Sequence, residues 1–165
     1  MALGDLARFS SDHQRARKLY REYRIRTSAV GNIIAEMCGL LNLAQLELEV
    51  GNFEQARRFL IDAEVLQERS SGQFYDSLFK CAWTALHCAT AEWSEADEIL
   101  KVFAGGWPEH RAVVKDQPWL LELAAGHAEE AGCEDRARSL LNLARDVWTR
   151  LGADDAVLRI DDKLK

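Results

Sequence analysis

Apolar and small residues recur at helical spacing along almost the whole chain. Short turns of polar or small residues are each followed by an alanine, and apolar residues come four and seven positions later. That spacing places them on one face of a helix. Glycine and proline, which interrupt helices, number only 10 and 2. The pattern predicts helices over residues 2–9, 13–27, 31–50, 53–69, 73–90, 94–104, 117–131, 134–151 and 154–164.

Four segments of the chain repeat one another. Their aligned alanines are Ala16, Ala56, Ala96 and Ala137, separated by 40, 40 and 41 residues. A second helical pattern precedes the turn in every copy from the second onward, so the repeating unit is a helix, a tight turn and a helix. The small alanine side chains allow the two helices of a unit to approach closely. A period of this size predicts a solenoid of helical hairpins.

These residues resemble the tetratricopeptide repeat family, and the clearest copy is formed by Leu40, Leu43, Ala44, Gly51, Asn52, Phe53, Ala56, Leu60 and Ala63. The longer unit, near forty residues, is similar to repeats in bacterial signalling and regulatory proteins. The resemblance implies an all-α fold of antiparallel hairpins stacked in a right-handed superhelix. It divides a single array, residues 1–165, into a partial repeat 1–30, repeats 31–71, 72–113 and 114–152, and a capping helix 153–165. The truncated first unit indicates either a fragment of a longer array or a start that pairs with another segment.

The charge balance argues against a nucleic-acid partner. The chain carries 21 Lys and Arg against 27 Asp and Glu, a net charge of −6, whereas nucleic-acid binders usually present a net basic surface. No apolar run approaches the ~18 residues needed to cross a bilayer, and the N-terminus has no signal-peptide pattern. Four cysteines without a CxxC pair fit a reducing compartment. We therefore expect a cytoplasmic protein that does not act at a membrane.

Sequence motifs of catalysis are not evident. There is no phosphate-binding glycine loop, no GxSxG and no HExxH, so we expect neither an enzyme nor a bound cofactor or metal. One candidate nucleophile pair, Cys88 with His127, would join adjacent hairpins. Among the tryptophans, Trp83, Trp93 and Trp148 are expected in the core, and Trp107 or Trp119 at a binding rim.

Members of the resembled family bind extended or helical peptides in a groove formed by the first helix of each unit. Carried over to this sequence, the groove consists of Gln45, Glu49, Cys81, Ala85, Cys88, Trp119, Glu122, Gly126 and Glu129. Its floor is small in the middle and acidic at one end, which favours a basic peptide segment. The alternative is that the protein's own neighbouring segments fill this groove.

A second surface is basic. Between residues 15 and 26, six of seven charged residues are cationic. This stretch is either a solvated helix face or a docking surface for an acidic partner or RNA, represented by Arg17, Arg21 and Arg24.

The sequence therefore predicts a protein-interaction module, a scaffold or adaptor that binds a peptide or partner protein without catalysis. The alternative function is a ligand- or peptide-sensing arm of a bacterial transcription or kinase regulator. Self-association through the ends of the array is a further expectation for its partners.

Overall fold

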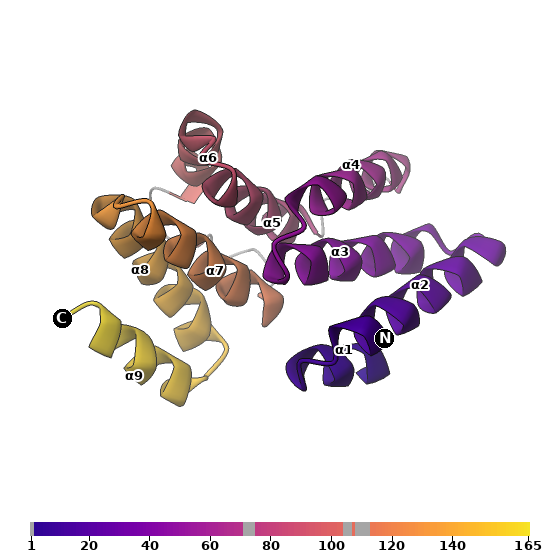
Figure 1. The fold of residues 1–165 in the computed structure, drawn as a ribbon, viewed down its shortest axis with the longest axis horizontal. Helices are drawn as coiled ribbons and strands as arrows, with labels where there is room; N and C mark the ends of the chain where they lie inside the picture. The colour runs from indigo at the N-terminus through magenta and orange to yellow at the C-terminus, as the bar shows by residue number, and fades with distance from the viewer. Residues whose placement is uncertain (1, 71–74, 104–106, 108–112) are drawn as a thin grey trace. The chain divides into compact units, whose positions relative to one another are not determined.

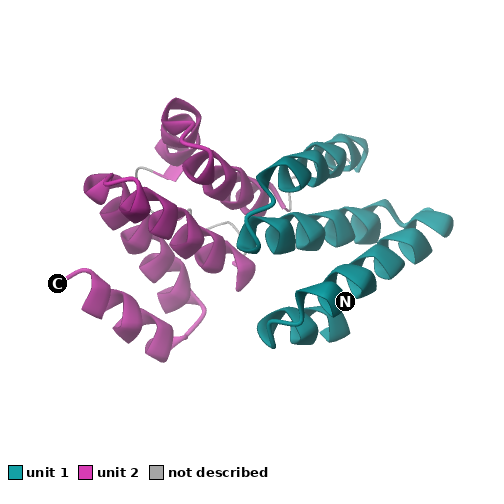
Figure 2. Cartoon of the chain, viewed as in Figure 1, with its two compact units in different colours: residues 1–73 teal, residues 74–165 magenta. Residues whose placement is uncertain are grey.

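The structure, a computed structural model, describes residues 2–70, 75–103, 107 and 113–165. Within these ranges the chain forms nine α-helices and one short 3-10 helix and contains no strand (Figure 1). The all-α prediction is therefore confirmed. The chain divides into two compact units, Met1–Gln73 and Phe74–Lys165, which Figure 2 distinguishes by colour. The right-handed superhelix concerns the relation between these units and stays a prediction.

Unit 1 contains four helices: α1 (Ala2–Phe9), α2 (His13–Ala29), α3 (Ile33–Glu49) and α4 (Phe53–Arg69). Each helix packs on the next one in sequence. The centre of the unit is α3, which is buried continuously from Gly39 to Leu48. That span includes the polar residues Asn42, Gln45 and Glu47, so the interior of unit 1 contains groups that need polar partners.

Unit 2 contains α5 (Asp76–Ala89), α6 (Trp93–Leu100), the 3-10 helix η1 (Lys101–Phe103), α7 (Asp116–Glu130), α8 (Glu134–Arg150) and α9 (Asp154–Lys163). Here α5 packs on both α6 and α7, α7 packs on α8, and α8 on α9. The predicted helix 94–104 ends earlier as an α-helix, because its last turn tightens to 3-10 geometry and buries Phe103. The expected helix limits at 73 and 104 lie outside the described residues.

One type of turn follows six of the helices. Its central residue has a positive φ angle, and the next N–H donates to the carbonyl five residues earlier, as Asn52 does to Glu47 over 2.8 Å. The turn occurs at Ser11, Gly31, Gly51, Ala91, Gly132 and Gly152. Because Gly31 belongs to such a turn and Asn32 caps α3, the predicted helix start at residue 31 is wrong by two residues.

The repeat alignment identified buried positions correctly. Ala16, Ala56 and Ala96 are fully buried and Ala137 is 3% exposed. A side chain of this size at a helix contact lets the two backbones approach closely, and a larger one would have no space.

The expected distribution of tryptophans is partly wrong. The buried tryptophan is Trp107, which stacks on Phe103 with ring centroids 5.0 Å apart. Trp83, Trp93 and Trp148 are only partly buried, as is Trp119. Each partly buried ring keeps one edge or face near solvent, which suits the amphipathic indole.

Candidate functional site

The predicted groove residues of unit 1, Gln45 and Glu49, already have a partner within the unit. Arg8 at the end of α1 donates from Nη1 to Gln45 Oε1 over 2.5 Å, and its Nε lies 3.4 Å from Glu49 Oε1. The Arg8 side chain is almost completely buried. A ligand that bound these two groups would have to displace a buried guanidinium, which is costly because the charge would lose its partners.

The groove residues on α5 are in the interior of unit 2. Cys81 and Ala85 are fully buried and Cys88 is 3% exposed. Burial raises the pKa of the Cys81 thiol, and burial together with the nearby Asp97 charge raises the pKa of Cys88 to about 12. Both thiols are therefore protonated at neutral pH and are poor nucleophiles. These residues shape the packing of the unit, and their thiols do not form an exposed surface.

The candidate nucleophile pair was Cys88 with His127. Besides burial, Asp97, Arg136 and Cys133 influence the pKa of Cys88. His127 on α7 has its Nδ1 3.6 Å from a carboxylate oxygen of Glu130. Thiol catalysis would need a low thiol pKa and a neighbouring base, and the Cys88 environment favours the neutral thiol.

The groove residues on α7 differ in exposure. The Glu122 side chain is only 10% exposed, and its Oε1 accepts from Trp148 Nε1 of α8 over 2.8 Å. The same oxygen accepts from Arg159 Nη2 of α9 over 2.9 Å, and this contact raises the pKa of Arg159. Glu122 therefore binds α8 and α9 to α7, so its carboxylate is committed within unit 2.

The other α7 positions are more open. The Glu129 side chain is exposed and has no partner within the described part of the chain. Gly126 has open space where a side chain would point, and Trp119 is partly buried. Of the three glutamates predicted to make the groove acidic, Glu129 alone keeps a carboxylate that no described residue neutralises. Contacts within each unit therefore already engage Gln45, Glu49 and Glu122.

The predicted basic surface divides into two sides of α2. Arg17 lies against α3 and forms a two-pronged ion pair with Glu47, with Nε–Oε1 2.6 Å and Nη2–Oε2 3.0 Å. Glu47 is fully buried and raises the pKa of Arg17. Arg24 also lies near α3, with its Nε 3.8 Å from Glu36 Oε1. These two arginines attach α2 to α3, and of the three predicted residues Arg21 faces solvent.

The solvent side of α2 contains more cations than the prediction named. We call this surface the α2 basic face, and it consists of Arg15, Lys18, Arg21, Glu22, Ile25 and Arg26. Its four cations are exposed, and their side chains have no partner among the described residues. Ile25 lies between them along the helix and is 68% exposed. The result is an apolar residue surrounded by unpaired positive charge in a chain whose net charge is −6.

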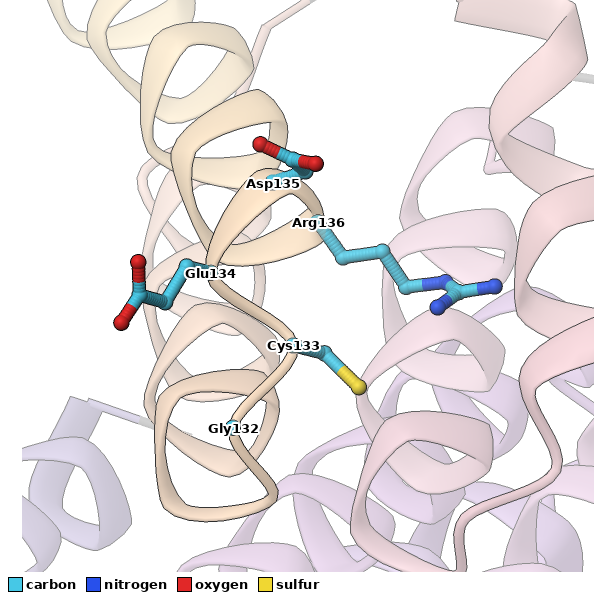
Figure 3. A pocket seen from close by; sticks show the side chains of 5 residues that line it. All are labelled: Gly132, Cys133, Glu134, Asp135 and Arg136. Carbon is cyan, nitrogen blue, oxygen red and sulfur yellow. The ribbon is translucent and has the colours of Figure 1, made fainter.

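A hollow of about 430 Å³ lies at the start of α8 and is lined by Gly132, Cys133, Glu134, Asp135 and Arg136 (Figure 3). Arg136 and Cys133 point to one side of the helix start and Glu134 points to the other.

The cation of this hollow is already paired. Arg136 bonds Asp97 of α6 through Nε–Oδ1 3.0 Å and Nη2–Oδ2 2.7 Å, and it lies 5.4 Å from the centre of the Trp93 ring. The guanidinium holds the pKa of Asp97 below its usual value. These contacts join α8 to α6. The cation that lines the hollow therefore has a structural role within unit 2. Across the described ranges, no group of three side chains is placed to hold a metal ion.

None of the helices, within the residues described, combines the length and apolar character that crossing a bilayer requires. A scan against protein-family models and a search of the curated proteins found no match to this sequence.

Proposed function

We propose that this chain is a protein-interaction module that binds an acidic surface of a partner protein through the α2 basic face. The observation that supports this most directly is the combination of four unpaired cations and the exposed Ile25 on one helix face. The inward side of the same helix is fixed to α3 by Arg17 and Arg24, so the outward side is presented from a supported element.

The apolar residue and the cations have different roles in such an interface. Full burial of an isoleucine side chain contributes roughly 1.5–3 kcal/mol, whereas an exposed ion pair contributes about 0.2–1 kcal/mol. Ile25 is therefore expected to give more affinity than any one cation. The cations select an acidic partner and accelerate its association, an effect that salt weakens.

A protein partner is favoured over RNA by the composition of the face. Surfaces that bind single-stranded nucleic acid usually stack bases on aromatic side chains. The α2 basic face has no aromatic residue, and Glu22 places a carboxylate among its cations. An acidic protein surface that also presents an apolar residue matches this pattern better than a phosphate chain does.

The test is affinity capture from an extract of the cells that make the protein, followed by titration of the captured protein against purified variants. Lys18→Glu with Arg21→Glu should weaken binding of the captured protein at least tenfold. The matched control reverses two exposed, unpaired arginines of α4, Arg58→Glu with Arg69→Glu, and should bind normally. Retained binding by the α2 variant would contradict the proposal.

One further substitution separates this surface from the predicted groove. Because Glu122 is bonded to α8 and α9, reversing it would disturb unit 2, so Glu129→Lys is the clean test of the groove. Binding that is lost with Glu129→Lys and kept with the α2 variant would assign the partner to the groove and make it basic. Capture of RNA by the wild type, lost in the α2 variant, would replace the protein partner with a nucleic acid.

A further inference from the structure

A second helix presents the opposite charge around an exposed apolar residue. On α9, Asp154, Asp155 and Asp162 are exposed, and Leu158 between them is 63% exposed. These residues lie within about 100° on the helix surface, by the rotation of 100° per residue. We call them the α9 acidic face. The fully buried apolar residue of this helix is Ile160.

The inner side of α9 is fixed to its own unit. Ile160 is buried, Arg159 bonds Glu122, and Arg145 Nη1 of α8 donates to Asp161 over 3.3 Å. These contacts determine which residues point outward. On the outer side, Asp154 and Asp155 have no side-chain partner among the residues described, and Asp162 has only Lys165, in a pair that is about three-quarters exposed. Such a pair contributes little and is easily exchanged.

From these two faces we infer that the protein associates with copies of itself head to tail, with the α9 acidic face of one copy on the α2 basic face of the next. This inference rests on the proposed binding role of the α2 basic face and names its occupant. It commits to a second copy because the complementary surface is present in the same chain.

The two faces are opposite in charge, and each contains one exposed apolar residue. The residues from Lys18 to Arg26 extend over eight helical steps, about 12 Å, as do those from Asp154 to Asp162, and Arg15 extends the α2 basic face by about one further turn. Leu158 lies in the middle of its face, and Ile25 lies near the C-terminal end of its own. Contact between the faces would bury Ile25 of one copy against Leu158 of the next. The cations of the α2 basic face would then lie opposite the carboxylates of the α9 acidic face. Burial of two such side chains supplies affinity, and the charges determine which surfaces meet.

The geometry also sets the kind of assembly. The contact joins two different surfaces, so each copy has one of each free for another neighbour. Such a heterologous interface produces rings or open chains rather than a closed pair with a twofold axis. The mass of the assembly should therefore rise with protein concentration, and it should fall towards the monomer as salt is added.

The experiment measures mass by sedimentation velocity and light scattering at low salt over a wide concentration range. Two charge-reversed chains are compared with wild type: the α2 variant, Lys18→Glu with Arg21→Glu, and an α9 variant, Asp155→Lys with Asp162→Lys. In either variant alone, the α2 and α9 faces carry charges of the same sign and repel each other. Each variant alone should therefore remain monomeric. An equimolar mixture should associate again, because each α2 face then meets an α9 face of opposite sign. A single chain that carries all four substitutions should also associate.

Matched controls place the same charge changes elsewhere. Glu54→Lys with Asp62→Lys on α4 mimics the α9 variant, since both helices receive a lysine at their second residue. Arg58→Glu with Arg69→Glu mimics the α2 variant. Both controls should associate like wild type, and circular dichroism should show equal helicity for all chains.

Three results would overturn the inference: a wild type that is monomeric at every concentration, a mixture that fails to restore association, or controls that lose it equally. If a variant failed to associate because it was misfolded, mixing it with the other variant would not restore association. Restored association in the mixture therefore shows that the charges on the two faces were the cause. A monomeric wild type that still binds the captured partner through the α2 basic face would reject self-association and leave the proposed function standing.

Discussion

The left-handed turn residues provide a direct test of the fold, because two of them are not glycine. Ala91 adopts φ 58° between α5 and α6, in the same turn that Gly51 forms with φ 76° between α3 and α4. In both turns the next amide donates over 2.8 Å to the carbonyl five residues earlier. Ala91→Gly should stabilise unit 2, and Gly51→Ala should destabilise unit 1.

The magnitude follows from two opposing contributions. A side chain in the left-handed region costs about 1–2 kcal/mol. Glycine offsets part of this by making the unfolded chain more flexible, by roughly 0.4–1 kcal/mol. The difference is a gain of about 0.5–1 kcal/mol for Ala91→Gly and a loss of similar size for Gly51→Ala. No heavy atom lies within 4 Å of a Cβ built on Gly51, so steric clash adds nothing there.

The assay uses the distribution of tryptophans. All five lie in unit 2, so their fluorescence follows the urea unfolding of that unit, and far-UV circular dichroism follows the whole chain. Separate signals are needed because two compact units need not unfold together. Ala91→Gly should raise the midpoint of the fluorescence transition with an unchanged slope. A midpoint that stays constant or falls would show that the turn is not held in the left-handed region.

Three further outcomes are expected. Gly4→Ala should lower stability by about 1–3 kcal/mol in thermal melts, since the new Cβ would lie 2.4 Å from Tyr20 Cε1; an unchanged melting temperature would mean that α1 can shift. Ala56→Trp should cost at least about 1–3 kcal/mol because that position is fully buried, and a stable variant would contradict the packing. Cys81 and Cys88 should be alkylated slowly in the native protein, because burial raises their pKa values; mass spectrometry of labelled peptides checks this, and equal labelling of all four cysteines would refute it.

Most of the secondary structure could be predicted from the sequence. The aligned alanines and the apolar residues that follow them are local signals, and they locate the helices to within a few residues in the described parts of the chain. The start of α3 was missed although the pair Gly31–Asn32 repeats Gly51–Asn52. The buried Trp107 was not predictable, because it lies outside any helix and no periodic pattern indicates its environment.

The direction in which charged side chains point could be predicted only in part. Arg17 and Arg24 lie within about 60° of the buried Tyr20 on a helical wheel, whereas Arg21 lies about 100° away. Helical geometry alone therefore distinguishes the inward arginines, Arg17 and Arg24, from the outward Arg21. The buried acceptor Glu47 could not be found this way, since its burial depends on the packing of α2 and α4 on α3. The commitment of Glu122 to Arg159 likewise depends on the position of α9.

The turns follow one another at about half the spacing of the sequence repeat, at residues 11, 31 and 51 and again at 132 and 152. The chain is thus a series of similar helices in which two side-chain patterns alternate, with the aligned alanines on every second helix. Duplication or loss of a single helix with its turn would keep the hydrogen bonds within the remaining helices and turns. It would, however, place two helices with the same side-chain pattern next to each other. Gain or loss of a pair keeps the alternation. This arrangement explains why the sequence repeats at forty residues, and it implies that arrays of this kind change length by whole hairpins.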